Sequence, residues 1–292
     1  MWRLLESRGY RNLIGRSSAE LDLRDRDATR EFFAQTRPEY VVDAAARVGG
    51  IMANVARPAE FLSDNLRIQV NLLDAAQEFG VRRFLFLGTS CIYPKHARQP
   101  ITEDQLLSGP LEPTNDAYAI AKIAGILHVQ ALRRQFGCSF ISVMPTNLYG
   151  PHDNFDLETA HVLPTLIRRM HDARAAGAPS VTLWGTGTPR REHLHADDLA
   201  RACLVLLERY DGAAPVNVGT GTDLSIRSLA ELIADVVGFQ GEIRFDSTMP
   251  DGTPRKLLDV SRIRSYGWEP QIELREGIAR TYQWMLTTNV AA

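Results

Sequence analysis

Cysteine and net charge are both scarce in this chain of 292 residues, and each scarcity excludes a class of protein. The three cysteines, Cys91, Cys138 and Cys203, cannot all pair and lack metal-ligand spacing, so neither a disulfide framework nor a zinc site is expected. A formal net charge of -2 gives no basic footprint for nucleic acid or an anionic membrane. We therefore expect no metal ion and no nucleic-acid or membrane partner.

Long apolar runs are also missing. No run is long enough to span a bilayer, and the first ten residues contain Arg3, Glu6 and Arg8, which do not suit a secretory leader. We therefore expect a cytoplasmic protein. What the chain does have is 45% hydrophobic and 23% charged residues. This composition can bury the core of one large α/β domain or of two unequal lobes.

Through about residue 150, short apolar runs alternate with helical patterns. The candidate strands are residues 13–15, 40–45, 83–87 and 140–145, and the candidate helices are residues 26–36, 57–79 and 115–136, the last with an N-cap at Asn115 or Asp116. Such alternation is typical of βαβ units and a parallel sheet. We predict an α/β fold with a Rossmann-like, doubly wound domain over residues 1–150.

The pattern changes after residue 150 to mixed helices, short strands and polar loops. Residues 161–175, 196–209 and 224–238 are predicted to be helices, and residues 180–184 a strand. We predict a smaller mixed α/β lobe over residues 151–292 that mainly binds the substrate, with some segments returning to the first domain.

Tyr118 and Lys122 form a Tyr-x-x-x-Lys pair, and a Gly-Thr-Ser-Cys segment at residues 88–91 follows the apolar run 84–87. Residues four apart lie on one helix face, so the Lys122 ammonium can sit beside the Tyr118 oxygen. A fixed cation is expected to lower the pKa of the phenol from about 10 toward the working range. These groups suit the reduction and rearrangement of a ketone.

Several longer segments carry a resemblance to a known family. The chain from Met1 to about Trp284 resembles the GDP-L-fucose synthases, the epimerase-reductases of the extended short-chain dehydrogenase/reductase group that act on GDP-4-keto-6-deoxy-D-mannose. The matching segments are residues 45–51, 90–95, 111–115, 118–125, 144–154 and 251–256. The resemblance implies epimerisation at carbons 3 and 5 of the keto sugar, followed by reduction of the carbon 4 ketone with NADPH.

The resemblance also assigns the catalytic groups. By position Cys91 matches the base and His161 the acid, and the ordinary pKa values of a thiol and an imidazole, about 8.5 and 6.5, suit proton exchange near neutrality. Tyr118 would protonate the carbon 4 oxygen with help from Lys122. Thr89 stands where the family usually has a serine. Taken singly, Cys91 could be a buried small hydrophobe and His161 a helix-surface residue.

Cofactor choice turns on charge after the second strand, where an acidic residue favours NAD and an arginine favours NADP. Arg16 stands there, so we expect NADP(H). The positions matched to the cofactor are Arg16, Asp22, Leu23, Ala44, Ala45, Leu87, Gly88, Thr89, Ser90, Tyr118, Lys122, Pro145, Thr146, Asn147, Leu148 and His161. The positions matched to the GDP-sugar substrate are Asn147, Arg169, Trp184, Arg191, Asp251 and Lys256.

One expected motif is missing from the sequence. A dinucleotide-binding sheet normally opens with a strand and a Gly-x-x-Gly-x-x-Gly turn, whose amides hold the pyrophosphate. Here residues 1–9 have the pattern of the helix that follows such a turn. The missing strand would lie inside a sheet of order 3-2-1-4-5-6, so we expect residues 1–25 to be poorly anchored.

Three hypotheses follow. The favoured one is an active enzyme of this family whose sequence is truncated or mis-started. The alternatives are another nucleotide-sugar epimerase or dehydratase, which would share Tyr118 and Lys122 without needing Cys91 and His161, and a non-catalytic remnant. The family also suggests a homodimer packed through the regions 57–79 and 115–136.

Overall fold

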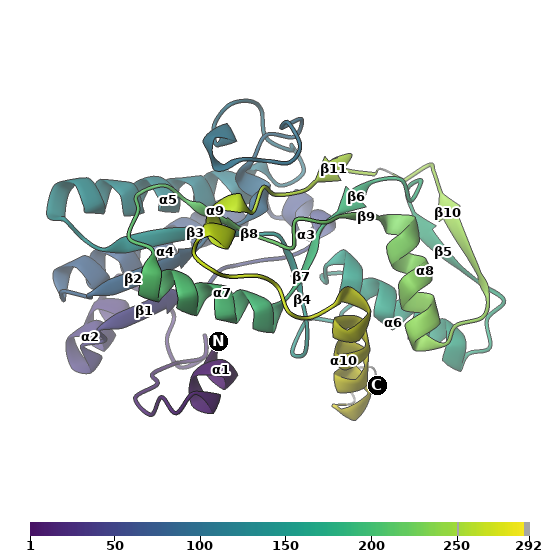
Figure 1. The fold of residues 1–292 in the computed structure, drawn as a ribbon, viewed down its shortest axis with the longest axis horizontal. Helices are drawn as coiled ribbons and strands as arrows, with labels where there is room; N and C mark the ends of the chain where they lie inside the picture. Colours follow the sequence, from purple (N-terminus) through teal and green to yellow (C-terminus); the bar gives the residue numbers. More distant parts are fainter. Residues whose placement is uncertain (250, 289–292) are drawn as a thin grey trace.

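A four-stranded parallel sheet forms one half of the molecule in the computed structural model, which describes residues 1–249 and 251–288 (Figure 1). Its strands, in order across the sheet, are β1 (Tyr40–Asp43), β2 (Arg83–Leu87), β3 (Phe140–Pro145) and β8 (Val216–Val218). All six residues of β3 are buried, as expected for an apolar strand covered on both faces. The predicted α/β fold with a parallel sheet is confirmed.

Helices cover both faces of this sheet. On one side lie α4 (Pro58–Glu78) and α5 (Asp116–Phe136), and on the other lies α7 (Ala196–Arg209) (Figure 1). The helix α2 (Arg26–Thr36) packs against α4. Local signals set the ends: Asp25 caps α2 by accepting from the Ala28 amide, and α5 ends at Gly137 in a left-handed conformation. Among the described residues, no helix is both long and apolar enough to cross a membrane.

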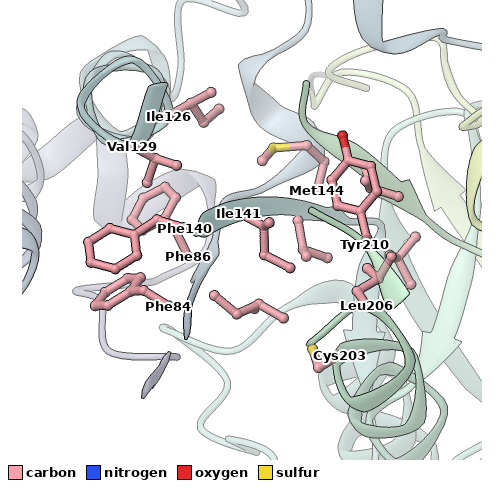
Figure 2. Packing of buried hydrophobic residues seen from close by; sticks show 14 of the residues in the cluster. Phe84, Phe86, Ile126, Val129, Phe140, Ile141, Met144, Cys203, Leu206 and Tyr210 are labelled. Carbon is pink, nitrogen blue, oxygen red and sulfur yellow. The ribbon is translucent and has the colours of Figure 1, made fainter. Parts of the chain in front are cut away.

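The core of this half is built from aromatic rings of the strands and aliphatic side chains of the helices. The rings of Phe84 and Phe140 lie 5.3 Å apart between centroids and are tilted by 39°. The helices α5 and α7 close the core from either face with Ile126 and Leu206 (Figure 2). These side chains are at most a few per cent exposed, so burial of their apolar surface is the main stabilising contribution of this half.

The other half contains three helices and a strand pair around a second core. The helices are α6 (Val162–Ala175), α8 (Ile226–Val237) and α10 (Leu274–Thr287), and the parallel pair is β5 (Ser180–Trp184) with β10 (Glu242–Asp246) (Figure 1). Chain segments return from this half to the first sheet: β8 and α7 come after residue 150 in the sequence, but β8 belongs to that sheet and α7 packs on it. The domain boundary at residue 150 stays a prediction.

Short strands and turns connect the two halves. β6 (Arg190–Arg191) lies between β11 (Arg255–Lys256) and β9 (Leu224–Ser225), and β4 (Asn147–Tyr149) pairs with β7 (His193–His195). The remaining short elements are α1 (Trp2–Ser7), α3 (Ile51–Ala56), η1 (Ser90–Ile92), η2 (Glu103–Gln105) and α9 (Ser261–Ser265). None of these five strands was predicted from the sequence, and β9 lies within the predicted helix 224–238.

Two predictions near the N-terminus are wrong. Residues 13–15 are irregular rather than a strand, and the strand predicted over residues 40–45 ends at Asp43. In the described residues β1 is hydrogen-bonded to β2 alone. A segment placed at 13–15 has no strand beside it to satisfy its backbone groups, so it does not become regular. The Arg3–Asp197 ion pair of 2.9 Å attaches α1 to α7.

Candidate active site

The candidate site lies where the parallel strands end, the edge at which α/β sheets bind their ligands. The Gly88 amide, just after β2, donates to the Val143 carbonyl at 2.8 Å. A Cβ on Gly88 would stand 2.6 Å from the sulfur of Met144. Glycine at this position therefore lets the exit of β2 approach β3 and sets the direction of the Thr89–Cys91 turn.

Lys122 is buried at this edge, with 2% of its surface exposed. Its Nζ donates to the Leu87 carbonyl at 2.9 Å and lies 4.7 Å from the centre of the Phe86 ring. Burial lowers the pKa of Lys122, and the charge of Asp43 opposes that shift. The lysine is thus fixed beside the end of β2 by a carbonyl, an aromatic ring and a carboxyl group.

Tyr118 lies one helical turn before Lys122, with its ring edge-on to Phe61 at 6.4 Å. Burial, and then the charge of nearby Cys91, raise the pKa of the Tyr118 phenol. The expectation that Lys122 lowers this pKa is wrong for this structure, because the Lys122 ammonium is directed to Leu87 instead. The phenol is therefore held in its protonated form.

Asp43 is a site residue that the sequence analysis missed. Its Oδ1 accepts from the Ala45 amide at 3.0 Å, while its Oδ2 is buried without a hydrogen-bond partner among the described residues. Burial raises the pKa of Asp43 to about 6, and Lys122 counteracts part of that rise. A charged residue inside the predicted strand 40–45 was the available signal, because buried strand positions seldom carry charge without a purpose.

Cys91 and Lys256 meet although 165 positions separate them in the chain. The Nζ of Lys256 lies 3.4 Å from the Sγ of Cys91, and the Cys91 amide donates to the Thr89 hydroxyl at 3.2 Å. Burial raises the pKa of the Cys91 thiol, but Lys256, Thr89 and Arg191 together lower it below its ordinary value. The thiol therefore has the environment of a reactive cysteine rather than of a structural one.

The other two cysteines lack these neighbours. Burial raises the pKa of Cys138, and it raises that of Cys203 to about 12. Both stay protonated near neutrality, as expected for structural thiols.

His161 is the residue that precedes α6, and its carbonyl accepts from the Thr165 amide. Displacement of water by the surrounding protein lowers the pKa of the imidazole, and the charge of Lys256 lowers it further. His161 and Cys91 thus share Lys256 as a common charged neighbour. The predicted acid and base are brought into one electrostatic environment.

Ionic and hydroxyl contacts secure the wall around Cys91. Glu112 pairs with Lys95 at 3.0 Å and accepts from the Thr253 hydroxyl at 3.3 Å. Arg191 donates to the carbonyl of Arg190 at 2.9 Å. Segments around residues 91–95, 111–115 and 251–256, all matched at the sequence level, therefore meet at one place.

The predicted cofactor positions after β3 are tied to the turn before β7. The Thr146 amide donates to the Val218 carbonyl at 3.0 Å. The Thr146 hydroxyl and the Asn147 side-chain amide both donate to the Glu192 carbonyl, at 3.2 and 2.9 Å. Pro145 ends β3 and Leu148 lies in β4, so this segment forms a fixed rim at the edge of the sheet.

The predicted positions near the N-terminus are engaged elsewhere. Arg16 lies over the Phe32 ring at 5.7 Å, and the Leu23 carbonyl accepts from Asn71 at 2.9 Å. Arg16 also donates to the Gly15 carbonyl at 2.7 Å, and in the part of the chain that the structure describes neither Arg16 nor Leu23 is hydrogen-bonded or ion-paired to Cys91 or Lys122. The structure thus does not bring this part of the predicted set to the site.

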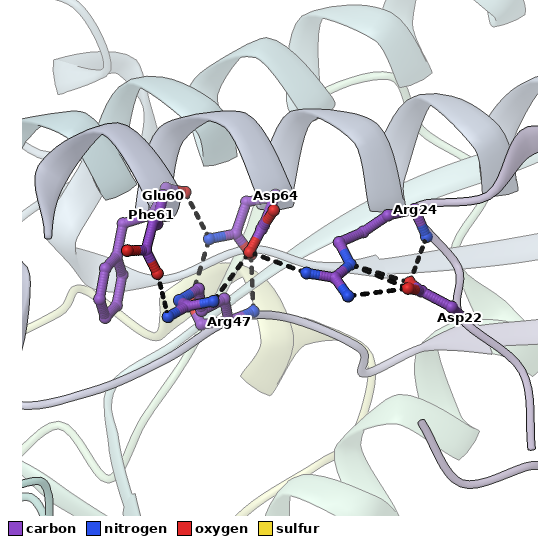
Figure 3. Close-up of polar contacts among 7 residues, drawn as sticks. Asp22, Arg24, Arg47, Glu60, Phe61 and Asp64 are labelled. Atoms are coloured by element: carbon purple, nitrogen blue, oxygen red, sulfur yellow. Dashed lines mark hydrogen bonds and ion pairs between the residues drawn. The ribbon is translucent and has the colours of Figure 1, made fainter. Parts of the chain in front are cut away.

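Asp22 belongs to a chain of alternating charges along α4 (Figure 3). It accepts from Arg24, which lowers the pKa of its carboxyl to about 2. Arg24 and Arg47 both reach Asp64, at 3.4 and 2.9 Å, and Arg47 also pairs with Glu60. This network holds the segment that follows β1 against α4. Ala44 and Ala45 are the first two residues of that segment.

The predicted substrate positions are divided among several contacts. Arg169 donates to the Thr182 carbonyl at 3.3 Å, and Trp184 is 50% exposed at the end of β5. Asp251 accepts from the amide and the hydroxyl of Thr186, at 2.7 and 2.8 Å. Asp251 therefore orders the turn after β5, and Arg191 and Lys256 of this set are the two whose charges lower the pKa of Cys91 within the described part of the chain.

Known proteins resemble this chain along nearly its whole length. The model of the NAD dependent epimerase/dehydratase family matches residues 1–219. GDP-L-fucose synthase 1 of Arabidopsis thaliana is 55% identical over 97% of this chain and 88% of that protein. The GDP-L-fucose synthase of Escherichia coli K12 is 52% identical over 97% of this chain and 91% of that protein.

A solved structure agrees with these relatives. The GDP-L-fucose synthetase of Naegleria fowleri bound to NADP has a TM-score of 0.89 at 30% identity, and the match covers 99% of this chain and 90% of that one. The chain therefore belongs to the NAD dependent epimerase/dehydratase family and, within it, to the family of GDP-L-fucose synthases.

Proposed function

We propose that the protein is an NADP-dependent epimerase-reductase that converts GDP-4-keto-6-deoxy-D-mannose to GDP-L-fucose. The observation that carries the proposal is the Cys91–Lys256 contact of 3.4 Å beside Tyr118. A ketoreductase needs only the tyrosine and the lysine, whereas an activated thiol adds a base for carbon acids. The two kinds of chemistry stand in one site.

Proton exchange at carbons 3 and 5 is assigned to Cys91 and His161. The ketone at carbon 4 makes both neighbouring hydrogens acidic. Cys91 removes a proton from one face of the ring carbon, and His161 supplies a proton to the other face. The lowered pKa of the thiol favours the basic form that this step needs.

Reduction at carbon 4 is assigned to Tyr118, Lys122 and Thr89. NADPH, when bound, supplies the hydride that reduces the ketone. The Tyr118 phenol gives a proton to the developing alkoxide, and its raised pKa keeps that proton available at neutral pH. The Thr89 hydroxyl would hydrogen-bond the ketone oxygen, and Lys122 would provide a fixed positive charge.

The residues at the sheet edge fit a dinucleotide. Parallel strands end there at small residues and hydroxyl groups, beside the buried Lys122, which donates to the Leu87 carbonyl. Ala44, Ala45, Leu87, Gly88, Ser90 and residues 145–148 would hold the cofactor. NADP over NAD is supported by the solved relative bound to NADP and by the sequence pattern at Arg16, whose guanidinium group suits the extra phosphate, although it lies over the Phe32 ring in this structure.

The half that begins near residue 151 is proposed to bind the GDP moiety. Arg169 and Arg191 offer guanidinium groups for the diphosphate, and the half-exposed Trp184 offers an aromatic face. Asn147, Asp251 and Lys256 complete the proposed substrate set. We further propose that the enzyme works in the cytoplasm as a homodimer through α4 and α5, which pack together and expose Val70, Ile120 and Leu127.

Replacement of Cys91 by serine tests the proposal. Cys91→Ser should slow deuterium incorporation from solvent into carbons 3 and 5 at least about 100-fold, the usual contribution of a positioned base. Tyr118→Phe should keep that incorporation and lose NADPH oxidation. Cys138→Ser, a matched control away from the site, should change neither rate.

Exchange is read by mass spectrometry of the keto sugar, and reduction by NADPH absorbance. Wild-type protein that reduces a keto sugar without exchange would be a keto-sugar reductase that lacks epimerase activity, and protein that shows neither net NADPH oxidation nor exchange at carbons 3 and 5 would leave another epimerase or dehydratase of the family as the alternative. That second result would contradict the proposal altogether.

A further inference from the structure

We infer that Lys256 is a positioning residue for proton exchange, which holds Cys91 as the thiolate, in addition to any contact it makes with the substrate. The inference rests on the proposed function for its catalytic meaning. Its structural basis is the 3.4 Å contact between Lys256 Nζ and Cys91 Sγ. The contact joins two side chains of the protein and does not involve the substrate, and both residues are partly buried.

The chemistry needs such a partner. An ordinary thiol with a pKa of about 8.5 is mostly protonated at neutral pH and is then a poor base. A cation at hydrogen-bond distance favours the anion and typically shifts the pKa by about 1–3 units. Lys256 is therefore placed to convert the sulfur from a weak acid into a base before the substrate arrives.

The exchange step balances without any redox partner. The thiolate lone pair takes the proton from carbon 3 or carbon 5, so an S–H bond forms as the C–H bond breaks. The electron pair passes into the enolate and reaches the carbon 4 oxygen. The protonated imidazole of His161 returns a proton to the opposite face, and both side chains then re-equilibrate with solvent.

Other charged and titratable groups also face the sulfur. Arg191 from β6 favours the thiolate at longer range, and Tyr118 from α5 feels the charge of Cys91. Burial lowers the pKa of His161, which precedes α6, and the charge of Lys256 lowers it further. Loss of the Lys256 charge should therefore raise the pKa of Cys91 and that of His161 together.

The direct test is titration of the thiol by thiolate absorbance at 240 nm and by its rate of alkylation with iodoacetamide. The signal of Cys91→Ser protein is subtracted, which removes contributions from Cys138 and Cys203. Lys256→Met should raise the apparent pKa of Cys91 by at least about 1 unit and slow alkylation at neutral pH about tenfold. Lys256→Arg, which keeps the charge, should retain most of the wild-type reactivity.

A second measurement connects the thiol to catalysis. The pH profile of deuterium exchange should move upward by about 1 unit in Lys256→Met and should stay near its wild-type position in Lys256→Arg. A Lys256→Met protein with a raised KM but an unchanged thiol pKa and an unchanged profile would overturn the inference and leave Lys256 as a substrate contact only.

The two proposals fail separately. A thiol pKa that rises in Lys256→Met, in a protein that shows no exchange, would support the pairing and contradict the proposed function. Exchange in the wild type, together with a thiol pKa that is the same in Lys256→Met, would support the proposed function and contradict the pairing of Lys256 with Cys91. Circular dichroism of each variant establishes that the compared proteins are folded.

Discussion

Asp43 and Lys122 are two charged side chains buried at the same edge of the sheet, with 3% and 2% of their surfaces exposed. Register places Asp43 across from Phe86, whose ring lies beneath the Lys122 ammonium. Each group shifts the pKa of the other toward its charged form, and burial shifts it away. The pair gives Lys122 a charged neighbour that sequence motifs do not indicate.

Replacement of Asp43 by asparagine should separate stability from activity. Because the folded pKa of about 6 lies above the ordinary 3.8, stability is lost as pH rises through this range. At pH 8 Asp43→Asn should therefore increase the free energy of unfolding by up to about 3 kcal/mol, and at pH 4 the gain should vanish. Reduction should slow, because Lys122 loses its counter-charge.

Urea unfolding at the two pH values measures the first effect, and NADPH oxidation measures the second. Glu39→Gln, at an exposed position just before β1, is the control and should leave both unchanged. An equal stability change at pH 4 and pH 8 would show that the charge of Asp43 is not the cause.

The Tyr118–Lys122 pair shows where residue-level prediction stops. Helical spacing correctly puts both residues on α5, but spacing alone does not say which acceptor the lysine will choose. In this structure Lys122 donates to the Leu87 carbonyl, 35 positions away, which is held in place by the sheet. Tertiary contacts of this kind are not encoded in a local motif.

At the scale of elements, α5 lies close to the sheet because Gly125 has no side chain. A Cβ there would stand 2.4 Å from the Phe86 ring and 2.9 Å from the Gln69 side-chain oxygen. Gly125→Ala should therefore destabilise the protein by about 1–3 kcal/mol, the usual cost of overpacking, reduced by up to about 1 kcal/mol of improved helix propensity.

The midpoint of urea unfolding gives this value. Gly109→Ala is the matched control, because its nearest atom, in Pro94, lies at an ordinary 3.4 Å, and it should be neutral or slightly stabilising. A Gly125→Ala protein as stable as the wild type would mean that α5 moves away from the sheet without cost.

The strand β7 should make the fold sensitive to acid through His193. Neither ring nitrogen of His193 has a hydrogen-bond partner among the described residues, and burial followed by the charge of Arg191 lowers its pKa to about 4. Since the folded pKa lies below the ordinary 6.5, its contribution to stability is present above pH 6.5 and is lost as pH falls toward 4. The loss amounts to about 3 kcal/mol.

His193→Gln should therefore flatten the decline in unfolding free energy between pH 7 and pH 4, measured by urea titration. His96→Gln, at an exposed loop position, should leave the slope as it is. Identical slopes for wild type and His193→Gln would assign the acid sensitivity to other groups.

Elements differed in how far the sequence predicted them. Long periodic helices such as α2 and α5, and apolar strands such as β2 and β3, match their predicted ranges within about one residue, because their burial pattern repeats often enough to be recognised. Strands of two or three residues, such as β6 and β11, carry no such pattern. Their existence depends on partners far along the chain.

At the scale of the whole molecule, Glu192 ties three segments together. Its buried carboxylate accepts from the amides of Gly221 and Leu258 at 2.6 and 3.0 Å and from the Thr220 hydroxyl at 3.3 Å. The proposed catalytic set could be chosen from matched motifs, whereas this connection could not be predicted from them, because it depends on how distant loops converge.

The proposed homodimer can be tested on the surface of α4 and α5. Val70 and Leu127 are 39% and 44% exposed, although both are apolar and lie on neighbouring helices. Replacing both with glutamate should halve the mass measured by light scattering, because like charges would face each other in a symmetric interface. Leu286→Glu, on α10 and also 39% exposed, should not change the mass. A monomeric wild type would contradict the proposal.

Cys91 and Lys256 are positioned by different sheets of the molecule. Cys91 follows β2 of the large sheet, whereas Lys256 lies in β11, whose neighbour Arg255 shares the Asp223 carboxylate with Arg190 of β6. If the two segments separated, Nζ would leave Sγ and the proton would return to the sulfur, since the attraction falls with distance. The basic form of Cys91 therefore depends on a contact between two segments that lie 165 positions apart in the chain.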